Sequence, residues 1–152
     1  MSIYARLKEL GIGIPPAPAP VATYVPYVVV DKLVFIAGQG AFNGKRLLYI
    51  GKVGQEVSEQ DAYESARLCA LNCLAQLQVA IGSLDRVKRI IRVGGFVNCG
   101  PDFTAHSQVI NGASDVLVQI FGDKGKHARI AVGMANLPMD TSVEVELMAA
   151  IE

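Results

Sequence analysis

The chain has 152 residues, enough for one domain, with 51% hydrophobic and 18% charged residues and a formal net charge of zero. Globular domains usually carry about 25% charged residues, so this chain has more apolar surface than a small monomer needs, which favours self-association. The absence of a basic excess argues against nucleic-acid binding. We expect neither a membrane span nor a signal peptide, and a cytoplasmic protein.

The first segment combines a short helical pattern with a proline-rich stretch. Residues 2–10 predict a short helix that ends at Gly11, where glycine adopts the left-handed conformation of a helix cap. Four prolines between positions 15 and 20 then predict an extended connector. We therefore divide the chain into an N-terminal helix with its connector, residues 1–18, and a single domain, residues 19–152.

The next segments alternate between strand and helix patterns. Residues 27–30 and 33–37 are rich in β-branched and aromatic residues and predict a β-hairpin, and residues 47–50 predict a further short strand. Ser58 is a natural N-cap for a helix that carries apolar residues at helical spacing as far as Gly82.

The helix pattern also contains two of the three cysteines, Cys69 and Cys73, one turn apart. This spacing is typical of buried thiols in a reducing compartment. No histidine partners them at metal-ligand spacing, and we expect neither a metal nor an organic cofactor.

The second half of the chain predicts a strand over residues 87–97, a helix over about 103–121 and two final strands around a Pro/Asp turn at 137–141. The order β-β-α-β-α-β-β predicts an α+β fold in which two helices pack on one face of a mixed sheet. The other face would then carry the contact between subunits.

The final strands contain the charged residues that matter most. In a simple hairpin Asn136 would pair with Ser142 and Glu144 would face Met134, about 16 Å along the sheet from Arg129. One subunit could then not easily bring Arg129 and Glu144 to one small substrate. We therefore expect both to act in a cleft shared by two subunits.

These patterns together resemble a known family. The residues that carry the resemblance are Pro26-Tyr27, Phe35 to Gln39, the helix from Ser58, Ala128-Arg129, Leu137-Pro138 and Val143 to Glu146. They are similar to the Rid family, also called YjgF-like or L-PSP endoribonuclease-like. The resemblance implies a chorismate-mutase-like (bacillus-type) fold and a homotrimer with ligand clefts between subunits. For the best-studied branch it also implies hydrolysis of reactive enamines and imines to 2-keto acids and ammonia.

The resemblance also implies roles for individual residues. Arg129 matches the arginine that binds the substrate carboxylate, and Glu144 matches the glutamate that positions the hydrolytic water. Tyr27 matches the tyrosine that lines the cleft, and Gly38 the glycine whose backbone faces the ligand. Structural alternatives remain open: an interface salt bridge for Arg129, an ordinary half-exposed strand position for Glu144, and a core position for Tyr27.

Three features depart from the deaminase branch and indicate a divergent subgroup. Ala131 replaces a cysteine, Ser107 replaces an asparagine, and the segment 121–127 is longer. We keep Ser107 as a candidate binding residue. It is not a candidate nucleophile, because the sequence places no base in register with its hydroxyl. His127 lies two residues from Arg129 and is a further candidate for the same cleft, with a plain loop position as the alternative.

The chemistry of a 2-imino acid suits this residue set. An arginine fork can hold the carboxylate, and a glutamate can accept a proton from the attacking water. The sequence thus predicts cofactor-free hydrolysis of imines such as 2-iminobutyrate, with a small 2-imino or 2-keto acid as the ligand. Two alternatives stay open: a trimer that binds a small carboxylate without turnover, and an endoribonuclease or translation inhibitor, as the family's other name suggests.

Overall fold

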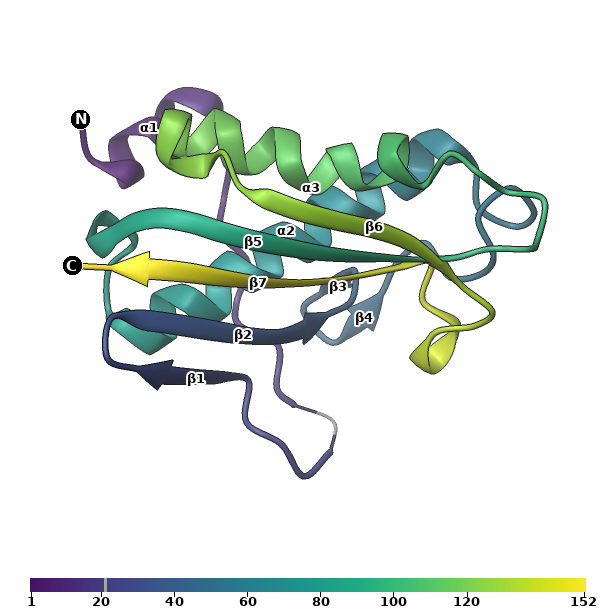
Figure 1. Cartoon of the computed structure of the whole chain (residues 1–152), viewed down its shortest axis with the longest axis horizontal. Helices are drawn as coiled ribbons and strands as arrows, with labels where there is room; N and C mark the ends of the chain where they lie inside the picture. Colours follow the sequence, from purple (N-terminus) through teal and green to yellow (C-terminus); the bar gives the residue numbers. More distant parts are fainter. Residues whose placement is uncertain (21) are drawn as a thin grey trace.

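The computed structural model describes residues 1–20 and 22–152, and its centre is a five-stranded mixed sheet with helices on one face (Figure 1). In chain order the elements are α1 (Ile3–Leu10), β1 (Tyr27–Val30), β2 (Leu33–Gln39), β3 (Phe42–Asn43), β4 (Arg46–Leu47), α2 (Glu59–Ile81), β5 (Val87–Asn98), α3 (His106–Phe121), β6 (Ala128–Met134) and β7 (Val143–Ile151). Short 3₁₀ turns follow α2, α3 and β6. The predicted α+β class, with helices on one face of a mixed sheet, is confirmed.

Local capping chemistry explains where the first two helices begin. The Ser2 hydroxyl accepts a hydrogen bond from the backbone N–H of Ala5 at 3.0 Å, and the Ser58 hydroxyl accepts one from Asp61 at 3.1 Å. Both predicted starts are confirmed. The third helix begins at His106 rather than near position 103, because residues 100–103 form a turn in which the N–H of Phe103 donates to the carbonyl of Gly100.

The order of strands in the sheet is β1-β2-β7-β5-β6, and this order corrects the predicted C-terminal hairpin. β6 runs parallel to β5, and β7 runs antiparallel to β5 on its other side, so β5 separates the two final strands. Asn136 does not pair with Ser142, and Glu144 lies opposite Phe96 rather than Met134. The reason is that α3 connects β5 to β6 as a crossover, which makes these two strands parallel neighbours. The side of β6 that faces the sheet is then occupied by β5, so β7 cannot pair with β6 as a hairpin.

The predicted strand over residues 47–50 is also wrong. Only Arg46 and Leu47 form a strand, as a two-residue partner of β3. Tyr49 has a positive φ of 55°, which interrupts an extended chain, and Ile50 makes one isolated bridge to Thr141.

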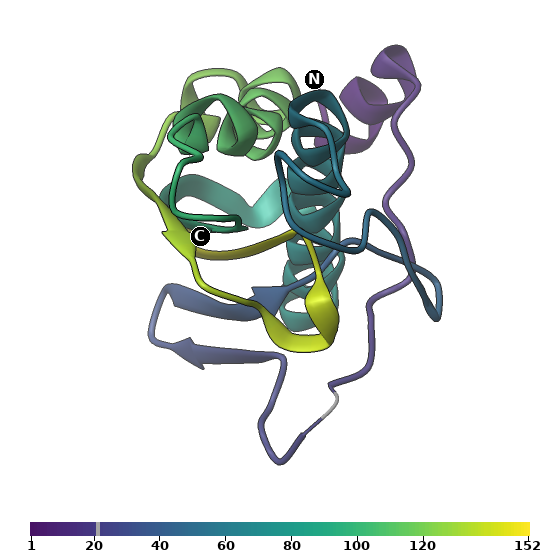
Figure 2. The same ribbon diagram turned by 90° about the vertical axis from the view of Figure 1, so that its right-hand side faces the viewer.

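The two faces of the sheet differ in cover. Side chains of α2 and α3 close one face, where Val93, Val97, Leu117 and Leu147 are almost completely buried. Figure 2 shows both helices on the same side of the sheet. No helix of the described chain covers the other side, which we call the open face.

The open face is apolar for much of its area. It carries Val28, Val30, Leu33, Phe35 and Ile130, each between 37% and 50% exposed. The first four lie side by side on β1 and β2 and form an apolar strip at one edge of the sheet, whereas Ile130 lies on β6 at the other edge. An exposed strip of this kind is unusual on a soluble monomer and is typical of a contact surface.

The N-terminal helix α1 packs on the body of the domain. Leu7 is buried in the core, and the phenol of Tyr4 donates to the side chain of Gln78 at 2.8 Å. The backbone N–H of Ile3 donates to Asp85 at 2.6 Å. Among the described residues, no helix combines the length and the apolar character that crossing a membrane requires.

Candidate functional site

Arg129 lies on the edge strand β6, where its side chain turns toward α3. One terminal nitrogen, Nη1, donates to Asn111 Oδ1 at 2.9 Å and to Ser114 Oγ at 3.2 Å. The other, Nη2, donates to the backbone carbonyl of Ser107 at 3.4 Å. All three acceptors are neutral, so they hold the guanidinium in place and leave its positive charge without a negative partner among them.

His127 belongs to the same group through Ser114. Its Nδ1 lies 2.5 Å from the carbonyl of Gly125, which can only accept, so Nδ1 carries the proton. The unprotonated Nε2 then accepts from the Ser114 hydroxyl at 2.8 Å, and Ser114 in turn accepts from Arg129. We refer to Arg129, Ser107, Asn111, Ser114 and His127 as the Arg129 cluster.

The electrostatics of the cluster favour a neutral imidazole. Burial lowers the pKa of His127 below its ordinary value, and the nearby positive charge of Arg129 lowers it further. The cluster therefore carries one positive charge near neutral pH. In the described chain, ion pairs join Arg6 to Glu9 and Lys126 to Asp123, and none involves Arg129.

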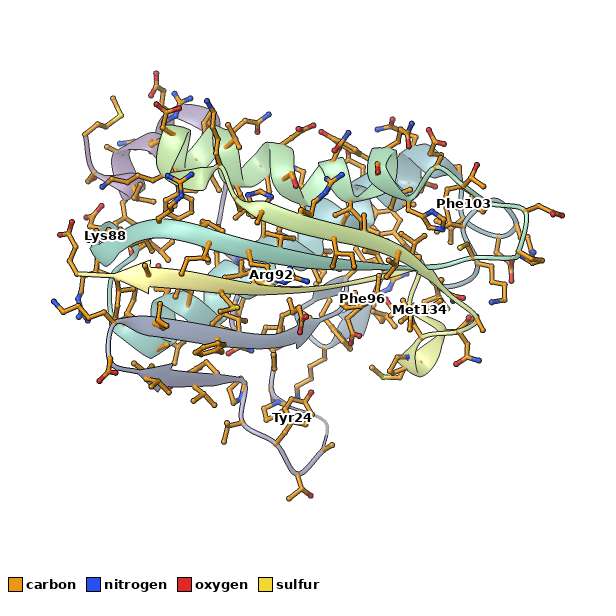
Figure 3. All side chains as sticks on the ribbon, viewed as in Figure 1. Tyr24, Lys88, Arg92, Phe96, Phe103 and Met134 are labelled. Carbon is orange, nitrogen blue, oxygen red and sulfur yellow. The ribbon has the colours of Figure 1, made fainter. Side chains whose placement is uncertain are left out.

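Glu144 lies elsewhere, in a cavity of about 600 Å³ at the end of β2 and β7. This cavity, the Glu144 cavity, is lined by Pro18, Ala19, Pro20, Ala22, Tyr24, Pro26, Ala37, Gly38, Gln39, Gly40, Phe42, Gln76, Phe96, Pro138, Met139, Thr141, Glu144 and Glu146. Figure 3 shows Phe96 on β5 and Tyr24 in the segment before β1. A mostly apolar wall with a few polar groups is typical of small-molecule sites.

Missing side chains on the neighbouring strands make room for the two glutamates of β7. A Cβ atom on Gly38 would lie 3.0 Å from Glu144 Cδ, and one on Gly94 would lie 2.9 Å from Glu146 Cγ. Burial raises the pKa of Glu144, and the negative charge of Glu146 raises it further. The protonated form of Glu144 is therefore favoured more than in an exposed glutamate.

The two groups are apart within one chain. Arg129 is paired with Val93 and Glu144 with Phe96, so they are displaced by three residues along β5, about 10 Å, and lie on strands on either side of it. The Arg129 side chain faces α3, whereas the Glu144 side chain lies over Gly38 on the open face. The expected separation thus has a different cause: opposite faces of the sheet rather than a long hairpin.

The remaining candidates divide between the two groups. Gly38 accompanies Glu144, while Ser107 and His127 accompany Arg129. Tyr27 is half-buried, packs against the hydrophobic core and does not line the Glu144 cavity; Tyr24 does.

Sequence reasoning missed Asn111, Ser114, Tyr24 and Glu146. Helical spacing from Ser107 to Asn111 and Ser114 places these residues along one face of α3, a pattern that could have revealed the first two. Across the described residues, three or more His, Cys, Asp or Glu side chains nowhere gather as a metal site would require.

The geometry, an α+β sheet with one open face and two separate charged groups, can be compared with known proteins. The family model described as "YjgF/chorismate mutase-like, putative endoribonuclease" matches residues 4–151. The chain therefore belongs to the YjgF family, and the resemblance found in the sequence is confirmed.

Individual relatives agree with this assignment over nearly their whole length. The chain is 41% identical to protein TCP17 of Trypanosoma cruzi, covering 98% of this chain and 94% of that protein. The crystal structure of a putative endoribonuclease from Shewanella oneidensis has a TM-score of 0.96 at 32% identity, covering 99% of this chain and 100% of that one. E. coli TdcF, crystallised with bound serine, has a TM-score of 0.63 at 25% identity, covering 90% and 94%.

Proposed function

We propose that the protein is a cofactor-free hydrolase of small 2-imino acids, acting in clefts between the subunits of a homotrimer. Arg129 of one copy would bind the substrate carboxylate, and Glu144 of a neighbouring copy would exchange protons with water. The observation that carries this proposal is the state of Arg129, a cation fixed by three neutral acceptors. The serine bound to TdcF supports an amino-acid-sized ligand.

The hydrogen bonds of Arg129 leave room for a carboxylate. A guanidinium has five N–H donors, and three are used within the chain. The two that remain, on Nε and Nη2, suffice for a two-point contact with a carboxylate. Ser107 contributes through its backbone carbonyl, and His127 holds the Ser114 hydroxyl that accepts from Arg129.

Glu144 would supply the acid–base chemistry. Its carboxylate accepts a proton from water as the water oxygen forms a bond to C2 of the protonated imine. It returns that proton to nitrogen, and as the C–N bond of the carbinolamine breaks it takes up the hydroxyl proton and passes it to the departing ammonia. One iminium ion and one water thus give one 2-keto acid and one ammonium ion. A carboxyl whose pKa is raised by burial is a better proton donor at a given pH than an exposed glutamate, and in its ionised form it is a stronger base.

The open face would supply the contact between copies. Its exposed apolar side chains, among them Val28, Val30 and Phe35, would be buried on assembly. A Phe35→Lys substitution places a charge in this strip and should turn a trimer into monomers, as measured by light scattering after size-exclusion chromatography. If the wild-type protein is itself monomeric at micromolar concentration, the proposal of a cleft shared by two subunits is wrong.

The first test is ammonia release from freshly generated 2-iminobutyrate. Wild-type protein should accelerate release, and Arg129→Ala should lose most of this acceleration. Arg6→Ala is the matched control, because Arg6 lies on α1 and pairs with Glu9 outside both charged groups. Equal rates for wild type and Arg129→Ala would end the proposal.

A mixing experiment tests the shared cleft. Arg129→Ala and Glu144→Gln proteins should each be inactive alone. After denaturation together and refolding, a mixed trimer contains clefts that join an intact Arg129 to an intact Glu144. Activity should therefore return, up to the fraction of clefts that contain both intact residues when the subunits assemble at random. If verified mixed trimers show no activity, Arg129 and Glu144 do not act together in one shared cleft.

Binding without turnover is the second candidate, favoured by the serine seen in TdcF. Calorimetry with 2-ketobutyrate or serine that shows binding dependent on Arg129, together with no ammonia release from 2-iminobutyrate, would select this alternative. The zero net charge gives no support for a nucleic-acid substrate.

A further inference from the structure

A second cavity, of about 500 Å³, lies beyond the end of β5, where none of its lining residues belongs to the Arg129 cluster or the Glu144 cavity. Its walls are formed by Lys52, Cys99, Gly100, Pro101, Phe103, His106, Gly133, Met134 and Ala135. Figure 3 shows Phe103 in the loop before α3 and Met134 at the end of β6, toward the same end of the molecule. The cavity thus combines a thiol, an imidazole and an ammonium group with apolar walls.

The thiol and the imidazole are in contact. Cys99 Sγ lies 3.5 Å from His106 Nε2, close enough for the thiol to donate its proton to the ring. Phe103 meets the His106 ring edge-to-face, with centroids 5.5 Å apart, and fixes its orientation. A cysteine that shares its proton with a histidine is the usual arrangement of a nucleophilic thiol.

The backbone of β6 leaves space for this pair. A Cβ atom on Gly133 would lie 2.5 Å from His106 Nε2 and 2.9 Å from Cys99 Sγ. Any larger residue would push the two groups apart or cover them. Cys99 is only 7% exposed, yet it lines the cavity, so a reagent must enter the cavity to meet the sulfur.

Lys52 adds a donor for an oxygen atom. Its ammonium group donates to the side-chain oxygen of Asn98 at 2.9 Å and to the carbonyl of Ala135. An ammonium has three protons, so one remains for a ligand in the cavity. A carbonyl oxygen is the matching acceptor.

We propose that Cys99 and His106 form a covalent binding site for small α,β-unsaturated carbonyl compounds. The thiol proton passes to His106 Nε2, and the sulfur forms a bond to the β-carbon of the conjugated alkene. Electron density moves to the carbonyl oxygen, which Lys52 stabilises, and the imidazolium returns the proton to the α-carbon. The product is a thioether, and no oxidant or cofactor enters the balance.

The chain contains its own control thiols. Cys69 and Cys73 are fully buried and point their sulfur atoms at the carbonyls of Val143 and Val145. Burial raises the pKa of both thiols, so neither should react while the protein is folded.

The test uses methyl vinyl ketone in small excess at neutral pH, followed by intact-mass measurement and peptide mapping. We expect one adduct, at Cys99, forming at least about tenfold faster than on N-acetylcysteine. Cys99→Ser should give none, and denatured protein should be labelled at all three cysteines. Labelling at Cys69 or Cys73 as fast as at Cys99, or a Cys99 rate no higher than that of N-acetylcysteine, would overturn the proposal.

Two variants separate the roles of the neighbours. His106→Gln keeps a polar side chain but cannot accept and return the proton in the same way. Its labelling rate should fall about tenfold at neutral pH and then rise with pH as for an ordinary thiol. Lys52→Met should slow the reaction with methyl vinyl ketone but not with methyl methanethiosulfonate, which has no carbonyl. If His106→Gln fails to fold, the pH profile of wild-type labelling decides: a profile identical to that of N-acetylcysteine refutes the pair.

Discussion

The Arg129 cluster and the Glu144 cavity prepare a charged group in opposite ways. Arg129 is surrounded by polar partners on α3 that are all neutral, so its charge is oriented and preserved. Glu144 has apolar walls and a like-charged neighbour, so its charged form is disfavoured. The comparison teaches that one fold can present a permanent cation and a carboxyl whose pKa is raised by its surroundings. A permanent cation suits the binding of an anion, and a carboxyl with a raised pKa suits proton transfer.

The largest effect should come from removing the proton-transfer group. Glu144→Gln keeps the size of the side chain but removes its titration, and we expect the rate of ammonia release to fall about 10²- to 10⁴-fold. Glu146→Gln is the comparison within the same cavity: it removes the like charge that raises the pKa of Glu144 but keeps Glu144 itself, so the rate should fall far less. Equal losses in the two variants would mean that the cavity needs negative charge rather than a particular acid.

A smaller effect should follow when Arg129 keeps its charge but loses its fork. Arg129→Lys should reduce kcat/KM about 10- to 150-fold, because a hydrogen bond to a charged group contributes about 1.5–3 kcal/mol. The loss should appear for substrates with a carboxylate and disappear for a neutral imine. An unchanged kcat/KM would show that Arg129 acts only as a point charge.

The support of Arg129 can be weakened without touching the guanidinium. Ser114→Ala removes one hydrogen-bond partner of Arg129 and the donor to His127 Nε2. Nη1 of Arg129 keeps its bond to Asn111, so only part of the support is lost. A net loss the size of an average hydrogen bond, about 0.5–1.5 kcal/mol, would raise KM about 2- to 10-fold with little change in kcat. Ser83→Ala, a change at the N-cap of the turn after α2, controls for loss of a hydroxyl alone.

The His127 imidazole should make stability depend on pH in one direction. Its folded-state pKa lies below the ordinary 6.5, so the folded protein disfavours the charged ring. The resulting stability is fully present above pH 6.5 and is lost as the pH falls through the folded pKa. Against His127→Asn, the wild-type melting temperature should therefore drop on acidification, as followed by circular dichroism. A constant difference between pH 5 and 8 would contradict burial of a neutral ring.

Glu144 should show the opposite sign, with the smallest effect. Its folded-state pKa lies above the ordinary 4.5, so ionising it costs stability as the pH rises through that range. Glu144→Gln should melt at a slightly higher temperature than wild type at pH 7 and at the same temperature below pH 4.5. Together with its loss of rate, this would mark Glu144 as a residue kept for function at the expense of stability.

The sequence alone determined the local elements of this protein. Ser2 and Ser58 cap their helices through hydroxyls that lie three residues from the N–H they bind, so the starts of α1 and α2 depend on near neighbours only. The alternation of β-branched residues likewise defines β1, β2 and β5. Family membership also follows from residues that can be read in order.

Only the tertiary structure decided which strands meet and which charged groups share a site. The insertion of β5 between β6 and β7 depends on a crossover through α3, and adjacent strands in the chain gave no sign of it. The same insertion sends Arg129 toward Ser114 and His127 and leaves Glu144 over Gly38. Contacts between residues far apart in the chain depend on packing across the whole sheet, because each strand has apolar positions that fit more than one neighbour.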